Sequence, residues 1–228
     1  MHTSKWSDQV TSVLVCDESV WFRRDLIVAL EASPVIEVMA EADDAESVVV
    51  EIQEAAPDVV WLGLRLSGSS GVRLTAAIRE LVPTARIIVV AGIEDGDARG
   101  QALKAGALGL VSRDDAIADA VRVTERVAWG RCELAPSDLV ALGSTYAGFR
   151  RQAESVQQRV LPPVLDPRQR DVLDRLAAGS EPTAVASALD IPLPVVENLV
   201  LDAVAKLYRY GRIEALAYAV GEHLFDAG

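Results

Sequence analysis

The chain has 228 residues, of which 50% are hydrophobic and 25% charged, and this predicts a soluble globular protein of two modest domains. No apolar run reaches the roughly 18 residues that cross a bilayer, and the N-terminus lacks the apolar segment of a signal peptide, so we expect a cytoplasmic protein with no membrane partner. The net charge of -12 argues against nonspecific attraction to nucleic acid, and the two cysteines and two histidines are too dispersed for a disulfide framework or a zinc site.

Five short runs rich in β-branched residues alternate with amphipathic stretches in the first part of the chain. The runs predict strands at 11–16, 35–41, 58–63, 85–91 and 107–112. The stretches between them predict helices at 19–32, 44–56, 71–82, 95–105 and 114–128, with Asp44, Asp95 and Asp114 as N-caps. This α/β alternation predicts a doubly wound five-stranded parallel sheet, covered by helices on both faces, with its site at the carboxyl ends of the strands.

The strand signal ends near residue 130, so we divide the chain into a domain at 1–130, a partly helical linker at 131–163 and a domain at 164–228. A helix at 166–179 begins with an aspartate cap, a proline at the first helical position and a glutamine three residues after the cap. Further helices at 183–189, about 194–208 and about 213–224 complete a small all-α domain.

Seven motifs, spread over nearly the whole chain, suggest descent from one family. The first half contains VLVCDES (13–19), PDVVWLGLRLSG (57–68), ARIIVVAG (85–92) and KAGALGLVSRD (104–114). The second half contains LDPRQRDVLDRLAAG (165–179), ALDIPLPVVENLVLDAVAKL (188–207) and GRIEALAYAV (211–220). With these motifs the chain resembles response regulators of the NarL/FixJ, or LuxR-type, family. The resemblance implies a receiver with flavodoxin-like strand order, followed by a four-helix helix-turn-helix domain that binds DNA.

The first half lacks most residues that phosphoryl transfer to an aspartate requires: the nucleophilic carboxylate, further carboxylates for Mg²⁺, and a hydroxyl and a cation for the phosphate oxygens. By the resemblance, Asp17 and Glu18 match the metal-binding acidic pair, but Gly63 replaces the phosphoacceptor aspartate. Ala91 replaces the serine or threonine, and Arg113 replaces the lysine. The resemblance therefore implies a vestigial phosphorylation pocket with no catalytic residue, no metal and no cofactor.

Two interpretations of Asp17 and Glu18 stay open. They form either a surviving Mg²⁺ site or an acidic remnant that is solvated or paired with Arg113, and the missing third carboxylate favours the remnant. Because arginine keeps its charge, a permanent contact of Arg113 with Asp17 or Glu18 would hold the domain in one state without phosphate. A small ligand in a pocket bordered by Trp21 is a further alternative, which the lack of a G-x-G-x-x-G loop disfavours.

The predicted recognition helix offers few side chains suited to DNA. By the resemblance, the DNA-binding candidates are Thr183, Val195, Glu197, Asn198, Lys206 and Arg209. Residues 164–228 contain six basic and ten acidic side chains, whereas a domain that binds DNA without a partner is more often basic.

The apolar residues of the recognition helix form a core stripe through Val196, Val200, Ala203, Val204 and Leu207. Val195, Leu199 and Leu201 fall outside this stripe, so we expect them to be partly exposed. They are either unimportant, a surface for a protein partner, or groups that contact thymine methyls.

Two functions therefore remain open. The first is an atypical, phosphorylation-independent transcriptional regulator that acts on DNA as a homodimer or as a heterodimer with another response regulator or transcription factor. The second is an interaction protein that does not bind DNA and instead sequesters or scaffolds another regulator. We do not expect an enzyme, because no nucleophile and base occur together at any candidate site.

Overall fold

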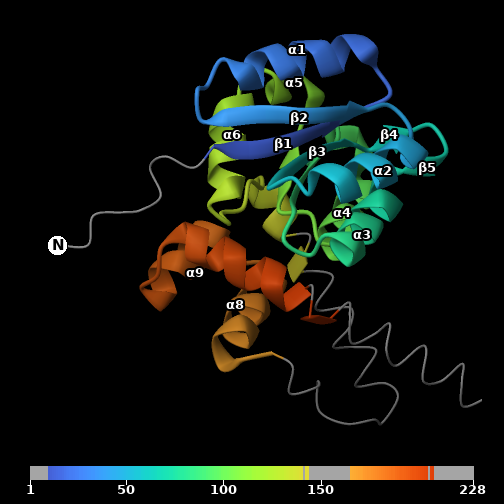
Figure 1. Cartoon of the computed structure of the whole chain (residues 1–228). Coiled ribbons are helices and arrows are strands. Elements are labelled where there is room, and N and C mark those ends of the chain that lie inside the picture. The colour runs from blue at the N-terminus through green and yellow to red at the C-terminus, as the bar shows by residue number, and fades with distance from the viewer. Residues whose placement is uncertain (1–9, 141, 144–164, 205, 208–228) are drawn as a thin grey trace, which may run out of the picture. The chain divides into compact units, whose positions relative to one another are not determined.

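The computed structural model describes residues 10–140, 142–143, 165–204 and 206–207 (Figure 1). The chain divides into two compact units, Met1–Ala135 and Pro136–Gly228. The domain and linker boundaries drawn from the sequence stay predictions, and the predicted helix at 213–224 lies outside the described residues.

A five-stranded parallel sheet forms the centre of the first unit, in the order β2-β1-β3-β6-β7. Its strands are β1 (Thr11–Cys16), β2 (Ile36–Ala42), β3 (Val59–Gly63), β6 (Arg86–Val90) and β7 (Gly109–Val111). The predicted doubly wound fold and its flavodoxin-like order are thus confirmed. Every residue of β3 is buried, as expected for a central parallel strand that is covered on both faces.

The helices of the first unit follow the strands as predicted. They are α1 (Val20–Glu31), α2 (Ala45–Ala55), α3 (Gly71–Leu81), α4 (Gly96–Ala105), α5 (Arg113–Ala116) and α6 (Ala120–Ala128). A single 3-10 turn, η1 (Ile93–Asp95), precedes α4, and the two-residue strands β4 (Arg65–Leu66) and β5 (Ser69–Ser70) pair before α3. The predicted helix at 114–128 is therefore two helices with a break between them.

The helix caps agree with the sequence only in part. Asp44 caps α2, because its carboxylate accepts a hydrogen bond from the Ser47 N–H at 2.8 Å. Asp95 precedes α4 but makes no cap hydrogen bond there. The Asp114 cap is wrong: Ser112 caps α5, and Asp114 lies inside the first turn of the helix.

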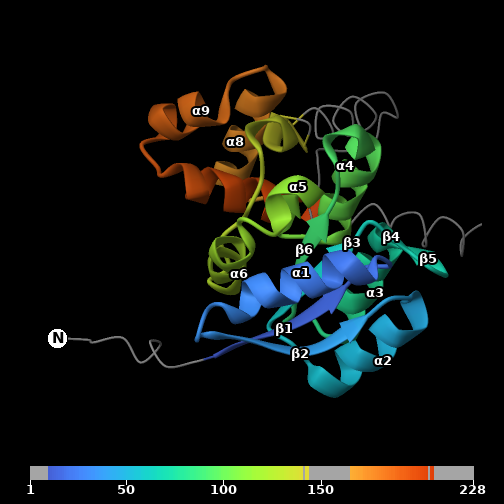
Figure 2. The same cartoon turned by 90° about the horizontal axis from the view of Figure 1, so that it is seen from above.

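The core of the first unit has two layers on opposite faces of the sheet. Figures 1 and 2 show α1, α5 and α6 on one face, and α2, α3 and α4 on the other. Between the sheet and α6, the buried Trp61 indole donates a hydrogen bond to Thr124 Oγ1 at 2.9 Å. This bond satisfies the one polar atom of the largest core side chain and fixes α6 over β3.

The free edge of β7 is paired by residues that the sequence assigned to the linker. Glu133 exchanges backbone hydrogen bonds with β7, where the Leu110 N–H donates to its carbonyl at 2.8 Å. Its carboxylate accepts from Arg122 at 2.9 Å and from Arg126 at 2.7 Å. Arg122 also donates a hydrogen bond to the half-buried Asp119, and this bond lowers the pKa of the Asp119 carboxyl. The first residues after α6 are therefore held on the first unit.

The described part of the second unit is helical. It contains helical residues at 136–140 and 142–143, α8 (Pro167–Ala177), α9 (Pro182–Leu189) and the helix Leu193–Val204. The predicted capping box is confirmed, since Asp166 and Gln169 exchange side-chain and backbone hydrogen bonds at the start of α8. Within the described residues no single helix is long and apolar enough to cross a membrane; α9 and Leu193–Val204 meet that test only as a joined pair, bent by 106°.

Candidate functional site

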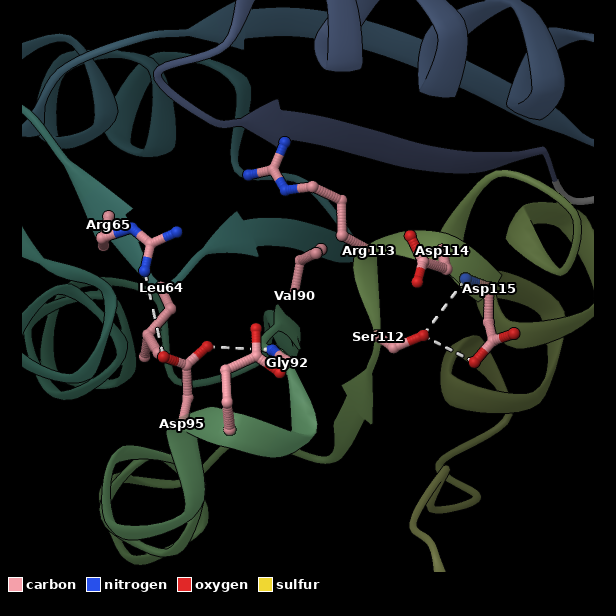
Figure 3. Close-up of a pocket in the computed structure, with 10 residues that line it drawn as sticks. Leu64, Arg65, Val90, Gly92, Asp95, Ser112, Arg113, Asp114 and Asp115 are labelled. Atoms are coloured by element: carbon pink, nitrogen blue, oxygen red, sulfur yellow. Dashed lines mark hydrogen bonds and ion pairs between the residues drawn. The ribbon is translucent and has the colours of Figure 1, made fainter.

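Strand register brings four of the predicted site residues to one edge of the sheet. Gly63 at the end of β3 pairs with Val90 of β6, which in turn pairs with Val111 of β7. Ala91 directly follows β6, Arg113 lies two residues after the end of β7, and Asp17 directly follows β1. The predicted vestigial pocket therefore lies at the carboxyl ends of the strands (Figure 3).

Both oxygens of the Asp17 carboxylate are engaged inside the protein. The side chain is only 1% exposed, and its Oδ1 accepts a hydrogen bond from the Ser19 N–H at 2.9 Å. Its Oδ2 accepts from Arg113 Nη2 at 2.6 Å, so Asp17 is the partner among the two that the sequence allowed. Glu18 is exposed, and in the described part of the chain no ion pair engages it.

Gly63 leaves the space that the Asp17 carboxylate occupies. A Cβ atom at Gly63 would overlap Asp17 Oδ2 and lie 3.1 Å from its Cγ. The neighbouring Gly71 is required for a similar reason, because a Cβ there would overlap the Gly63 carbonyl oxygen and lie 2.9 Å from Leu64 Cα. The buried Asp17 carboxylate thus occupies the space that the Cβ atom of any larger residue at position 63 would need.

Arg113 is held from two sides. Besides its ion pair with Asp17, its guanidinium carbon lies 4.2 Å from the centre of the Phe22 ring, within the range of a cation–π contact. The side chain of Arg113 is 44% exposed, so part of it remains in contact with water. A planar, permanently charged group suits this position better than lysine, because it stacks and donates at the same time.

Two further arginines, which the sequence reasoning missed, hold the loops around the site. Arg23 is 7% exposed; its Nη1 donates to the Asp17 carbonyl at 2.7 Å and its Nε to Glu41 at 2.9 Å. Arg99 is 8% exposed, and its Nη1 donates to the Ala91 carbonyl at 2.7 Å. The sequence held a signal for Arg23, because it stands at helical spacing with the core residue Leu26, where a charge needs a buried partner.

The thiol beside Asp17 adds no charge to the site. Cys16 is 1% exposed, and burial raises the pKa of its thiol well above the ordinary range, with the negative charge of Asp17 acting in the same direction. Cys16 is therefore a neutral core residue.

An open pocket of about 420 Å³ lies in front of the edge. It is lined by Leu64, Arg65, Val90, Gly92, Glu94, Asp95, Ser112, Arg113, Asp114 and Asp115. Trp21, which we expected at its border, is 72% exposed and is not part of the lining.

The residues present do not fit the Mg²⁺ ion that the fold family implies. Gly63 supplies no carboxylate, and Asp17 Oδ2 is paired with Arg113. Among the described residues no group of three or more His, Cys, Asp and Glu side chains is arranged to hold a metal.

The candidates on the recognition helix differ in exposure. Leu201 is 6% exposed, so its predicted exposure is wrong, and the DNA-binding candidate Glu197, at 8% exposed, is also buried. They are i, i+4 neighbours beside the core stripe, and the buried side of the helix is wider than that stripe. Val195 is 40% exposed and Leu199 is partly exposed, as predicted.

Of the polar candidates, Thr183 and Asn198 are exposed. Lys206 forms an ion pair with Asp202 at 2.7 Å and donates a hydrogen bond to Gln169 at 3.3 Å. Its ammonium group is therefore already paired with residues of the second unit. Arg209 lies outside the described residues.

Comparison with known proteins places the chain in a family. Residues 13–122 match the model of the response regulator receiver domain. The protein named "Probable transcriptional regulatory protein NarL" of Mycobacterium tuberculosis is 31% identical over 94% of this chain and 95% of its own length. The signal receiver domain of NarL from that organism is 30% identical, with a TM-score of 0.51 over 54% of this chain and 99% of its own. RcsB of Salmonella typhimurium, at 20% identity and a TM-score of 0.53, shares the fold over 86% of this chain and 92% of its own.

Proposed function

Because the chain belongs to the NarL-type response regulators, we propose that it is a transcriptional regulator that acts on DNA as a dimer without phosphorylation of its receiver. The observation that carries this proposal is the Asp17–Arg113 ion pair in the space beside Gly63. The pair places a carboxylate and a guanidinium where, by the resemblance, receivers of the family use a phosphoryl group and a lysine. In the proposal phosphorylation does not switch this site, and the activity of the receiver depends on its concentration and its partners.

The three arginines support a receiver that stays in one conformation. Arg23 and Arg99 each donate to a backbone carbonyl of a loop at the site, and Arg113 donates to the Asp17 carboxylate. Buried hydrogen bonds from charged groups are worth more than neutral ones, because an unmade bond leaves a desolvated charge. In the proposal these bonds hold the loops that a phosphoryl group would otherwise reposition.

The acidic second unit supports dimeric rather than monomeric binding. One copy offers few basic side chains to phosphate, and Lys206 already pairs with Asp202. Two copies on adjacent half-sites double the number of contacts, and the second copy binds at a raised effective concentration. A heterodimer with another response regulator or transcription factor would supply the missing basic contacts in the same way.

The proposal is tested by selecting genomic fragments with the purified full chain and measuring their affinity by mobility shift. We expect a recurrent two-part site, and we expect Asn198→Ala to weaken binding to it by about tenfold or more, since an amide that reads a base edge is worth roughly 1–3 kcal/mol. Thr183→Ala tests the other exposed polar candidate. Failure to select any fragment, with or without a partner regulator, would contradict the proposal.

One observation favours a second function, that of an interaction protein that does not bind DNA. The exposed side of the helix Leu193–Val204 presents Val195 and Leu199 beside Asn198, and the Asp202 carboxylate near them pairs with Lys206. Apolar and acidic groups suit a protein surface better than a phosphate backbone. For this function we expect Leu199→Lys to abolish partner capture and to leave the fold unchanged, whereas Asn198→Ala retains capture.

A further inference from the structure

A polar network joins the start of α8 to the last turn of the helix Leu193–Val204. Gln169, at 1% exposed, lies at its centre: its Nε2 donates to Asp202 Oδ2 at 2.5 Å, and its Oε1 accepts from the Asp166 N–H at 3.1 Å. Lys206 Nζ donates to the same two oxygens, to Asp202 Oδ2 at 2.7 Å and to Gln169 Oε1 at 3.3 Å. The network therefore holds one positive charge between two acceptors.

The contact of Asp202 with Lys206 differs from an ordinary ion pair on a helix surface. Exposed pairs four residues apart contribute little to stability, because both side chains lose rotamer freedom when they meet. Here the acceptors are positioned by the fold: Asp202 by the buried Gln169 amide, and Gln169 by the N-cap of α8. The side chain of Lys206 is only 30% exposed, whereas that of Asp202 is 52% exposed. The carboxylate thus remains at the surface while it pairs with the ammonium group.

The network lies on the same side of the helix as an exposed candidate for DNA contact. Asn198, Asp202 and Lys206 follow one another at intervals of four residues, so their side chains lie along one ridge. Asn198 is exposed, and Asp202 comes between it and Lys206. A DNA phosphate that approached this ridge would meet a carboxylate where binding requires a basic side chain.

We propose that Asp202 takes the place of a DNA phosphate in the free protein and withholds Lys206 from DNA, and this rests on the proposed function because it sets the DNA affinity of the second unit. On binding, the Lys206 ammonium exchanges the Asp202 carboxylate for a phosphate oxygen, and Asp202 keeps its hydrogen bond from Gln169. Both oxygens accept charge-assisted hydrogen bonds, so the exchange breaks one ion pair for the one that it forms. A single copy therefore gains little from Lys206, which favours binding by two copies or with a partner.

Combined substitutions at Asp202 and Lys206 in the full chain test this exchange. Affinity is measured on a random-sequence DNA duplex at several salt concentrations, because phosphate contacts do not depend on base sequence. Asp202→Asn removes the charge but keeps an acceptor oxygen for Gln169, so the fold should be retained, and thermal unfolding checks this. We expect about threefold higher affinity or more, and a salt slope steeper by about 0.9 per bound copy, the value for one further phosphate contact.

Removing the ammonium group separates the release of Lys206 from the loss of repulsion between Asp202 and phosphate. In a Lys206→Met protein, Asp202→Asn should raise affinity by less than about 1.5-fold, because no ammonium group is left to release. Asp171→Asn is the matched control, since Asp171 pairs with Arg175 four residues later on α8 at 2.9 Å. It should leave the affinity within about twofold of wild type.

Nitrogen-15 NMR of the lysine ammonium groups gives a readout that needs no DNA. The chain has three lysines, Lys5, Lys104 and Lys206. Asp202→Asn should speed the exchange of the Lys206 ammonium protons with water by about threefold or more and leave that of Lys104 unchanged. The proposal is overturned if this exchange does not change, if Asp202→Asn does not raise affinity, or if it raises affinity equally in the Lys206→Met protein.

These outcomes are separable from the proposed function. If wild type selects no genomic fragment but Asp202→Asn raises affinity for the random duplex only when Lys206 is present, the transcriptional role fails and the contact stands. If wild type selects DNA while Asp202→Asn changes neither affinity nor proton exchange, the contact fails and the transcriptional role stands.

Discussion

Gly63 and Asp17 are close neighbours at the site. The carboxylate of Asp17 fills the space beside Gly63, where Arg113 and the Ser19 N–H bind its two oxygens. The sequence predicted the loss of the acceptor and a contact between Arg113 and an acidic residue. It did not predict that Asp17 would stand where a side chain at position 63 begins, because that depends on the register of two strands.

Restoring the missing carboxylate with Gly63→Asp should destabilise the receiver by about 2 kcal/mol, since it forces a second buried carboxylate against Asp17. It should also fail to give efficient phosphorylation, because Ala91 still lacks a hydroxyl. Urea unfolding measures the first effect and intact mass after acetyl phosphate the second. Gly96→Asp is the control, because a Cβ at Gly96 meets nothing within 4 Å. This prediction would be contradicted by a Gly63→Asp protein that is as stable as wild type and is phosphorylated stoichiometrically.

Removing the guanidinium with Arg113→Ala leaves the Asp17 carboxylate buried with one hydrogen bond fewer. We expect a loss of about 2 kcal/mol in the free energy of unfolding, below the value for a fully buried pair because Arg113 is 44% exposed. Arg65→Ala is the matched control: its 3.9 Å ion pair with Asp95 lies at a side chain that is 75% exposed, so its loss should cost less than about 0.5 kcal/mol. Equal losses in the two variants would contradict the assigned role of Arg113.

Secondary structure elements were predicted well where hydrophobic periodicity dominates. The five strands and the capping box at Asp166 agree with the sequence, because strand runs and cap patterns are local signals. The failures depend on tertiary context. Asp114 lost the cap position to Ser112, whose hydroxyl is two residues earlier, and Glu133 joined β7 through arginines of α6. Glu197 is buried although its residue type favours exposure.

The cap of α2 makes a prediction about pH. The Ser47 N–H lowers the pKa of the Asp44 carboxyl below its ordinary value, so the cap contributes stability that is fully present above about pH 4, the pKa of an unfolded aspartate. That contribution is lost as the pH falls through the lowered folded pKa. Wild type should therefore exceed Asp44→Ala in stability at neutral pH, and the gap should shrink below about pH 4.

Urea unfolding across this range measures the gap. Asp44→Asn keeps an acceptor oxygen at the cap and does not titrate, so its gap to Asp44→Ala should stay constant over the same range. A wild-type gap that grows as the pH falls would contradict the assignment.

Because Glu197 is buried, we expect a charge change at this position to lower the stability of the second unit rather than to raise its affinity for DNA. Glu197→Lys would raise DNA affinity if this side chain faced a groove. At 8% exposure it should instead destabilise the unit by roughly 2–3 kcal/mol, because a lysine cannot reuse the surroundings of a buried carboxylate. Thermal unfolding compared with Asn198→Lys, at an exposed position of the same helix, measures the difference. A stable Glu197→Lys protein with tighter DNA binding would contradict this prediction and would favour Glu197 as a residue that faces DNA.

At the scale of the whole molecule, the charges of the two units both bear on how the activity of the protein is controlled. The first unit pairs the buried carboxylate of Asp17 with Arg113, and the second presents few basic groups to DNA. In our account neither unit responds to phosphate, and association between chains controls the activity of the protein. Weak pairing between chains makes output depend steeply on the concentration of the protein. The fold could be predicted from the sequence, but this division of roles depends on side-chain contacts that only the structure gives.

The most direct test of the central claim is to treat the purified full chain with acetyl phosphate and Mg²⁺, then measure intact mass and affinity for a selected DNA fragment on the same sample. A phosphorylatable receiver treated in parallel shows that the donor is active. Our account predicts no added phosphoryl group and a dissociation constant within about twofold of the untreated protein, a difference below 0.5 kcal/mol. A stoichiometric phosphoryl adduct on the receiver, accompanied by a change in DNA affinity of about tenfold or more, would contradict it.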